Sequence, residues 1–247
     1  MDSPLRLARI AGLLYLIVAV FGGFAFAYVL ARVYTPGDAS VTAANVLANS
    51  GLVRIGIVAD LIQATVFAFL GMTFYQLLKP VNKNAARSMM ILVAIATTIM
   101  CLNLVFEFAA MFVATNPSYA TAFGAAGSNA LVLLLLDMHH YGFLIAQVFF
   151  GLWLIPLGYL AYKSAMFPRA LGVVLIAGGT CYLIDLLVKF LLPDLAATTS
   201  GFLVITPTIA ELWMVGYLLI KGVKLPAQST STQRAAKTSP VMDSILQ

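Results

Sequence analysis

Charged residues are scarce in this sequence of 247 residues, at 9%, whereas soluble domains carry about 25%. Hydrophobic residues reach 62%, and the mean hydropathy is +0.99. A water-soluble core could not bury so much apolar surface, so the scarcity of charge excludes an ordinary soluble domain. The composition indicates a polytopic membrane protein.

Cysteines, histidines and catalytic signatures are also scarce. Cys101 and Cys181 fall in apolar runs, so they are predicted to be small buried hydrophobic residues rather than parts of a disulfide framework or a CxxC metal motif. His139 and His140 are adjacent and point about 100° apart on a helix, so both cannot easily bind one metal. No HExxH, GxSxG, GxGxxG or Walker A motif occurs. The sequence therefore predicts no metal site, indicates no cofactor and disfavours an enzyme.

Apolar runs near the bilayer-spanning length of about 20 residues occur six times. They predict an all-α, polytopic integral membrane bundle of six transmembrane helices within residues 1–225. The segment 226–247 is rich in Ser, Thr, Ala and Gln, which predicts a disordered cytoplasmic tail. The spans are predicted at roughly 10–31, 55–78, 88–114, 138–162, 170–192 and 202–220.

Basic residues are distributed unequally between the two sides of the predicted membrane. Eleven of the fourteen flank the spans on the side that holds both termini, whereas Arg32 lies on the other side, and Arg54 and Lys189 lie at or within the membrane. The positive-inside rule then predicts both termini in the cytoplasm. The basic balance thus reflects topology and indicates no nucleic-acid partner. An alternative is that "AFA" at Ala25–Ala27 marks cleavage of the first helix as a signal peptide, although its uncharged run is long for one.

Two segments on the opposite side are predicted to form short outer-surface helices. Thr35–Gly51 combines turn residues, helix formers and a terminal glycine. Ser128–Leu136 precedes the fourth span, and one helix over 129–163 would be about 52 Å long at the α-helical rise. Because this exceeds one membrane crossing, we expect a break near Asp137, which would serve as the N-cap of the span.

Four stretches resemble an uncharacterised bacterial membrane family known as domain of unknown function 4386. They are "TPGDASVTAANVLA", "GLVRIGIVADLI", "LLKPVNKN" and "FPRALGVVL", and the resemblance covers about 5–224. The resemblance implies a multi-helix membrane protein from a bacterium, and hence a location in the bacterial inner membrane. It supplies no substrate, cofactor or catalytic residue.

Four acidic residues lie inside four different spans. Asp60, Glu107, Asp185 and Glu211 are each predicted about 8 to 14 Å from the outer end of their span, as is Gln147. An ionised side chain in the membrane costs at least about 2.5–3.5 kcal/mol, so such residues normally face a bundle interior or a water-filled cavity. The four acids are therefore predicted to meet in one polar layer in the outer half of the membrane.

Polar neighbours at helical spacing extend this layer. The acids would face one base, Lys189, or two if Arg54 reaches inward, so a proton or a cationic ligand is needed to balance the charge. His140 shares a helix face with Gln147, whereas His139 is predicted to be an interfacial polar residue. The candidate ligand-binding residues are Asp60, Gln63, Glu107, His140, Gln147, Asp185, Lys189 and Glu211.

Three interpretations of this layer remain open. The first is binding or transport of a small polar or cationic ligand, or of protons. The second is an intramembrane enzyme that uses the acids and His140, with or without a metal. The third is a scaffold, because polar pairs can join membrane helices without any ligand and Asp185 can neutralise Lys189 one turn away. The lipid bilayer is the one partner that the sequence indicates, and it does not indicate an oligomeric state.

Overall fold

The computed structural model describes residues 3–224, and the predicted tail at 226–247 lies outside that range. Within it the chain forms helices and no strand, and six helices are long and apolar enough to cross a membrane, as predicted. The first span, Pro4–Val33, joins α1 (Pro4–Gly23), the π-helical segment η1 (Phe24–Leu30) and α2 (Ala31–Val33). The other spans are α4 (Ser50–Leu78), α5 (Lys83–Thr115), α6 (Pro117–Lys163), α7 (Arg169–Leu191) and α8 (Pro193–Ile220).

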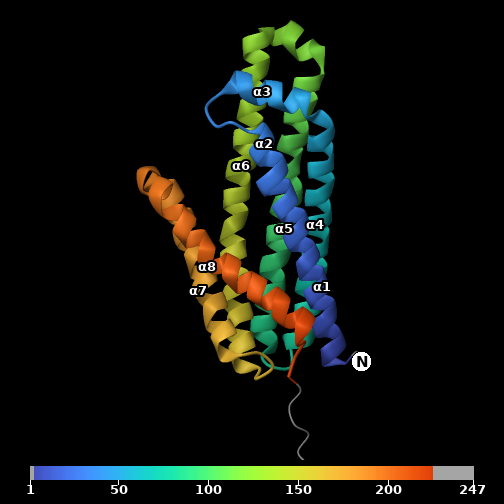
Figure 1. The fold of residues 1–247 in the computed structure, drawn as a ribbon, viewed down its shortest axis with the longest axis vertical. Helices are drawn as coiled ribbons and strands as arrows, with labels where there is room; N and C mark the ends of the chain where they lie inside the picture. Colours follow the sequence, from blue (N-terminus) through green and yellow to red (C-terminus); the bar gives the residue numbers. More distant parts are fainter. Residues whose placement is uncertain (1–2, 225–247) are drawn as a thin grey trace, which may run out of the picture.

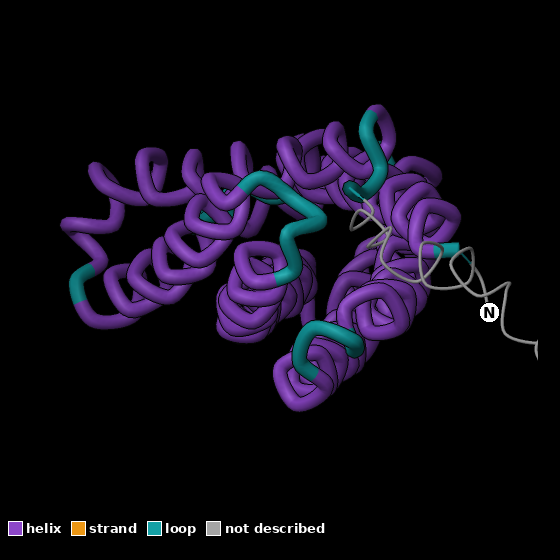
Figure 2. The backbone as a smooth tube through the Cα atoms, turned by 90° about the horizontal axis from the view of Figure 1, so that it is seen from below, coloured by secondary structure: helices purple, strands orange, loops and turns teal. Residues whose placement is uncertain are grey.

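The spans pack around a ring in the order of the chain (Figure 1). The first span packs against α4, and each later span packs against the next, until α8 returns to α1. The turn between α7 and α8 stands away from the other helices in both ribbon views (Figures 1 and 2). The ring is thus tightly joined through its long helices and spreads apart where this hairpin diverges.

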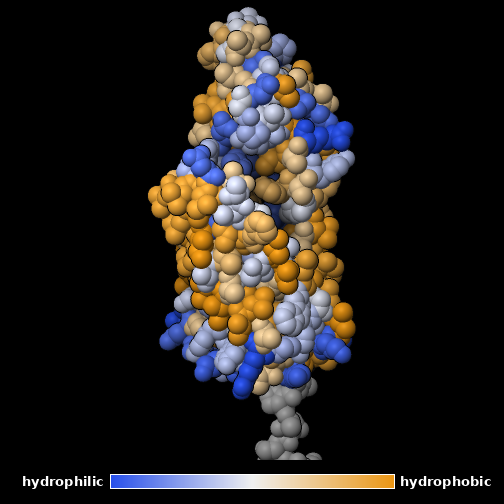
Figure 3. All heavy atoms as spheres, turned by 60° about the vertical axis from the view of Figure 1, so that its left-hand side comes forward, coloured by the Kyte–Doolittle hydropathy of each residue, from blue (hydrophilic) through white to orange (hydrophobic). Residues whose placement is uncertain are grey.

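The two ends of the bundle differ in character. Hydrophilic side chains gather at the lower end, below a belt of apolar side chains (Figure 3). We call this the basic end, because Lys79 and Lys83 at loop 79–82, and Lys163 and Arg169 on either side of loop 164–168, lie there. The opposite end carries α3 (Ala39–Ala48), the short helix predicted within 35–51, and we call it the α3 end.

The helix α3 begins and ends with local hydrogen bonds. The Asp38 carboxylate caps its start by accepting a hydrogen bond of 2.9 Å from the Val41 amide. This bond and a second one from the Ser40 hydroxyl lower the pKa of Asp38. Its C-cap is Asn49, not the predicted Gly51, which already belongs to α4.

The predicted break near Asp137 is wrong. The helix α6 runs from Pro117 to Lys163, and its non-helical residue is Gly124, at φ 72° and ψ 162°. A glycine adopts this positive φ without steric cost, whereas 129–137 contains neither glycine nor proline to interrupt the helix. Asp137 is therefore an interior residue of α6, and Asn116 is the N-cap.

Apolar side chains face outward as well as inward. Cys101 is exposed on α5 and Cys181 is only partly buried, which corrects the prediction that both are buried. Leu102 next to Cys101 is 66% exposed. In a membrane span an apolar side chain is equally suited to lipid and to the interior, so hydrophobicity alone does not indicate burial.

Two hydrophobic clusters fill the bundle, one toward each end. The larger cluster lies toward the basic end and includes Met100, and the smaller lies toward the α3 end and includes Ala110. On α5 the acidic Glu107 lies between these two residues. The polar residues of the spans thus occupy the level at which the two clusters separate.

Candidate functional site

A cavity of about 510 Å³ lies at this level, and all six spans contribute side chains to its lining. The cavity brings together seven of the eight predicted site residues: Asp60, Gln63, Glu107, His140, Gln147, Lys189 and Glu211. The eighth, Asp185, is fully buried behind Gln147 and does not line the cavity. Because α8 begins at Pro193 and not near 202, Glu211 lies farther along its helix than the predicted boundary implied.

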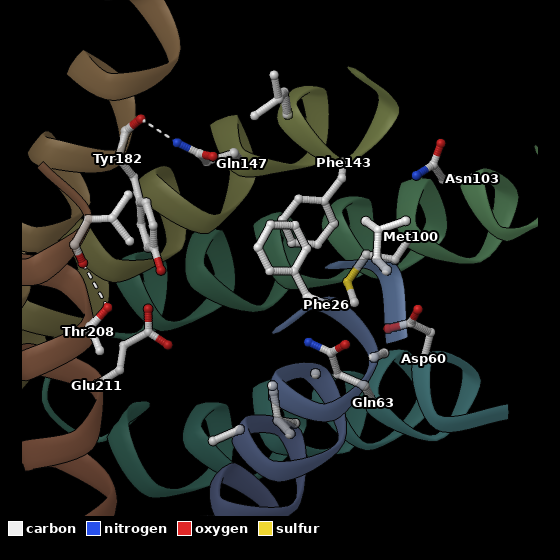
Figure 4. A pocket seen from close by; sticks show the side chains of 18 of the residues that line it. Phe26, Asp60, Gln63, Met100, Asn103, Phe143, Gln147, Tyr182, Thr208 and Glu211 are labelled. Atoms are coloured by element: carbon white, nitrogen blue, oxygen red, sulfur yellow. Dashed lines mark hydrogen bonds between the residues drawn. The ribbon is translucent and has the colours of Figure 1, made fainter. Parts of the chain in front are cut away.

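The wall formed by α4 and α5 carries two carboxyl groups. Glu107 is 3% exposed, and its Oε2 atom is buried without a hydrogen-bond partner among the described residues. Asp60 faces the cavity from α4 beside Gln63 (Figure 4). Neither carboxyl group forms an ion pair within residues 3–224. Burying an unpaired carboxylate is costly, so this wall favours a bound proton or cation.

The opposite wall carries Glu211. The hydroxyl of Tyr182 points from α7 toward its carboxyl group (Figure 4). The Tyr15 hydroxyl of α1 is buried and lies within electrostatic reach of Glu211. Thr208 donates its hydroxyl hydrogen to Val204 O at 2.7 Å, so it offers the cavity only oxygen lone pairs. This wall therefore also presents an acidic group with no cation beside it.

The pair Asp185 and Lys189 is neutralised locally. Lys189 Nζ lies 2.7 Å from Asp185 Oδ2, and Gln147 Nε2 donates a hydrogen bond of 2.8 Å to the same oxygen. Gln147 also donates to Tyr182 O at 3.1 Å. Arg54, the other base that could have balanced the acids, is exposed and does not line the cavity. Lys189 is therefore already paired with Asp185. The carboxyl groups of Asp60, Glu107 and Glu211 have no basic partner in the described range.

Two aromatic rings stand between the acidic walls (Figure 4). Phe26 of η1 and Phe143 of α6 stack with ring centroids 5.3 Å apart and planes 21° apart. Asp60 and Gln63 lie to one side of this pair, and Glu211 lies to the other. The aromatic pair thus divides the cavity into two acidic regions.

Both histidines line the cavity, so the assignment of His139 to the interface is wrong. His139 is 6% exposed, and Asn103 Nδ2 donates a hydrogen bond of 2.7 Å to its carbonyl oxygen. His140 is half-buried, with its ring 5.8 Å from that of Tyr34. Across residues 3–224, no three His, Cys, Asp or Glu side chains lie close enough together to hold a metal ion.

Tyr34 connects the first span to α6 near the α3 end. Its hydroxyl donates a hydrogen bond of 2.5 Å to Asp137 Oδ1. Partial burial, followed by this hydrogen bond and the nearby carboxylate, raises the pKa of Tyr34. Asp137 thus has a definite partner and holds the chain that leads into α3.

Four aromatic residues that the sequence patterns do not predict also line the cavity: Tyr15, Phe26, Phe143 and Tyr182. Aromatic side chains are common in membrane spans, and neither phenylalanine differs in sequence from a lipid-facing one. The tyrosines carry a weak signal, because a hydroxyl in mid-span needs a polar neighbour. That signal could have drawn attention to Tyr15 and Tyr182.

The fold and the cavity define the class: an all-α, multi-pass membrane protein whose helix ring encloses an acidic cavity. The chain belongs to the family described as domain of unknown function (DUF4386), which it matches over residues 10–222. It is also similar to an uncharacterized protein of Archaeoglobus fulgidus, with 34% identity over 84 residues. The match covers 33% of this chain and 46% of that relative, so the chain spans about half of the relative's length. No solved structure matches the sequence.

Proposed function

We propose that this protein binds a small cationic or protonated ligand in its cavity and carries it across the bilayer. The observation that supports this most directly is the imbalance of charge. Three carboxyl groups line a cavity whose one lysine is paired with Asp185. In a low-dielectric interior the negative charge is balanced by protons or by a cation, so the cavity is matched to cargo of positive charge.

The candidate site is divided between two roles. Asp60, Glu107 and Glu211 bind the positive charge, and Gln63 and His140 offer hydrogen bonds beside them. Asp185, Lys189 and Gln147 hold α6 and α7 together and set the position of the wall. A scaffold needs only this second group, because unpaired carboxyl groups facing a cavity add nothing to helix packing.

Binding can be tested on the purified protein with two monovalent cations, methylammonium and tetraphenylphosphonium. We expect at least one of these cations to bind, and its affinity to fall about tenfold or more in Asp60→Asn and in Glu107→Gln. Asp194→Asn is the matched control, because Asp194 is exposed at the start of α8, outside the cavity. If neither cation binds, and liposomes show no proton flux that depends on Glu107, the proposal is wrong.

The two other interpretations give different results in the same variants. A scaffold predicts that Asp60→Asn and Glu107→Gln change stability or assembly alone. A metal enzyme predicts near-stoichiometric metal after purification without a chelator, lost in His140→Ala. Measuring melting temperature, metal content and cation binding on one set of preparations separates the three.

We also propose that the basic end faces the cytoplasm of a bacterial cell, in the inner membrane, as the positive-inside rule predicts. A cysteine replacing Gly37 at the α3 end should then react with an impermeant maleimide in intact cells, once Cys101 and Cys181 are replaced by serine. A cysteine replacing Lys83 at the basic end should react only after permeabilisation. The reverse labelling pattern would show that the α3 end, and not the basic end, faces the cytoplasm.

A further inference from the structure

The cavity reaches the exterior on one side of the bundle. The lining residues that are exposed belong, without exception, to the first span and α8: Ala19, Gly23, Phe26, Thr208 and Leu212. Lining residues from α4, α5, α6 and α7 are buried or half-buried. The opening of the cavity therefore lies between the first span and α8.

The packing of the helices explains this opening. The helix α8 packs against α7 and α1, whereas η1 packs against α4. The part of α8 that approaches the α3 end thus leans away from η1 together with α7 (Figure 1). The space-filling view shows a hollow in the surface, bordered by both apolar and hydrophilic side chains (Figure 3).

The rim of the opening is uncharged and lies at mid-span. Its exposed residues carry no ionisable group, and Thr208 has already used its hydroxyl hydrogen within α8. Ala19 and Phe26 lie well inside the span Pro4–Val33, and Thr208 lies well inside Pro193–Ile220. Acyl chains, not water, adjoin a transmembrane helix at that depth. A hydrated cation would meet only the hydroxyl oxygen of Thr208 there to replace its water, whereas a molecule dissolved in the bilayer reaches the rim directly.

The interior combines charge with apolar surface. The acidic groups lie on two walls, and the faces of Phe26 and Phe143 lie between them. Leu104, Leu144 and Val215 are apolar members of the same lining. A cation beside aromatic rings gains a further attraction from their π-faces, and 510 Å³ is within the range of sites for drug-sized molecules, roughly 300–1,000 Å³.

We infer that the ligand is a cationic amphiphile, with a positively charged or protonated head and an apolar body, which enters the cavity from the bilayer between the first span and α8. This inference rests on the proposed function and narrows its ligand to one chemical class. The head lies beside the unpaired Glu107 or Glu211, and the apolar body lies along the aromatic pair and the aliphatic lining.

The class of ligand is tested by comparing two probes of equal charge on the full chain in lipid nanodiscs. We expect tetraphenylphosphonium, which partitions into bilayers, to bind at least about tenfold more tightly than methylammonium. Its affinity should fall about tenfold or more in Glu107→Gln or Glu211→Gln. Binding of methylammonium without tetraphenylphosphonium would overturn the inference and leave the proposed function intact. Binding of neither probe would overturn the inference, and the absence of Glu107-dependent proton flux in liposomes would then overturn the proposed function as well.

The route is tested by narrowing the opening. Thr208→Trp fills the rim, and Ile209→Trp is the matched control, because Ile209 is 54% exposed on the adjacent position of α8 and does not line the cavity. We expect Thr208→Trp to slow tetraphenylphosphonium binding about tenfold or more, with Ile209→Trp unchanged. Ala19→Trp and Val20→Trp form a second pair on α1, which keeps the test decisive if one variant fails to fold. Equal rates in a rim variant and its control would show that the ligand does not pass between the first span and α8.

Discussion

The side-chain amide of Gln147 donates a hydrogen bond of 2.8 Å to the carboxylate of Asp185 across the interface of α6 and α7. Lys189 approaches the same oxygen at 2.7 Å from the next turn of α7. These contacts separate Asp185 from the other acids of the spans. Its charge is balanced within the wall, whereas Asp60, Glu107 and Glu211 face the cavity without a basic partner in the described part of the chain.

Removing Lys189 alone should destabilise the bundle more than removing the whole ion pair. Lys189→Met removes the cation beside the fully buried Asp185 carboxylate and leaves the Gln147 amide and the nearby Ser200 hydroxyl as its polar neighbours. We therefore expect the free energy of unfolding to fall by about 3 kcal/mol. In Asp185→Asn combined with Lys189→Met, both charges are gone, so the loss should fall to about 1 kcal/mol. Denaturant titration in mixed micelles measures both values. A double variant as unstable as Lys189→Met would show that the pair contributes more than mutual neutralisation.

Neutralising Glu107 should leave the fold as stable as before or more stable. Its Oε2 atom is buried without a partner in the described range, so the carboxylate contributes desolvation cost and no compensating contact. We expect Glu107→Gln to retain or raise the free energy of unfolding by about 1 kcal/mol while it removes cation binding. Asp194→Asn should change neither quantity. A clear loss of stability in Glu107→Gln would assign this residue a structural role and favour the scaffold interpretation.

The fold was predictable because membrane spans are recognised by length and hydropathy alone. Each span was found, and errors arose at their ends, where helices extend beyond the apolar run. The clearest case is α6: the sequence predicts a helix start at Asp137, whose side chain instead accepts a hydrogen bond from Tyr34. That bond joins residues 103 positions apart, so no local pattern could indicate it.

The site was predictable to the extent that charge inside a membrane is rare. Asp60, Glu107 and Glu211 were identified on this ground, and all three line the cavity. The same rule could not distinguish these cavity-lining acids from Asp185, which is equally acidic but is buried behind Gln147. The role of Phe26 depends on where η1 leaves the ring open, which is a property of helix packing and not of the residue type.

The contact between α6 and α7 should depend on glycines that allow close approach. A Cβ atom added to Gly158 would lie 2.6 Å from Gly172 O, which is backbone and cannot move aside. We expect Gly158→Ala to lower the free energy of unfolding by about 2 kcal/mol, within the range for overpacked cores. Gly216→Ala on α8 is the control, because an added Cβ there meets nothing within 4 Å and should stabilise the helix by about 0.5–1 kcal/mol. Equal effects of the two substitutions would contradict the close packing of α6 on α7.

The bond between Tyr34 and Asp137 should give a pH-dependent contribution to stability at the α3 end. Partial burial and Asp137 raise the pKa of Tyr34 in the folded protein. The contribution to stability is therefore fully present below the pKa of an unfolded tyrosine, about 10, and is lost as the pH rises through the higher pKa of the folded protein. We expect Tyr34→Phe to destabilise the protein by about 1 kcal/mol at neutral pH. Tyr28→Phe is the control, because Tyr28 is 51% exposed and its hydroxyl makes no hydrogen bond with a described residue.

Phenolate absorbance provides the second measurement of the bond between Tyr34 and Asp137. The absorbance signal that disappears in Tyr34→Phe should be one that titrates above the ordinary tyrosine range. If that signal titrates at or below the ordinary pKa, the hydrogen bond to Asp137 does not hold this part of the chain.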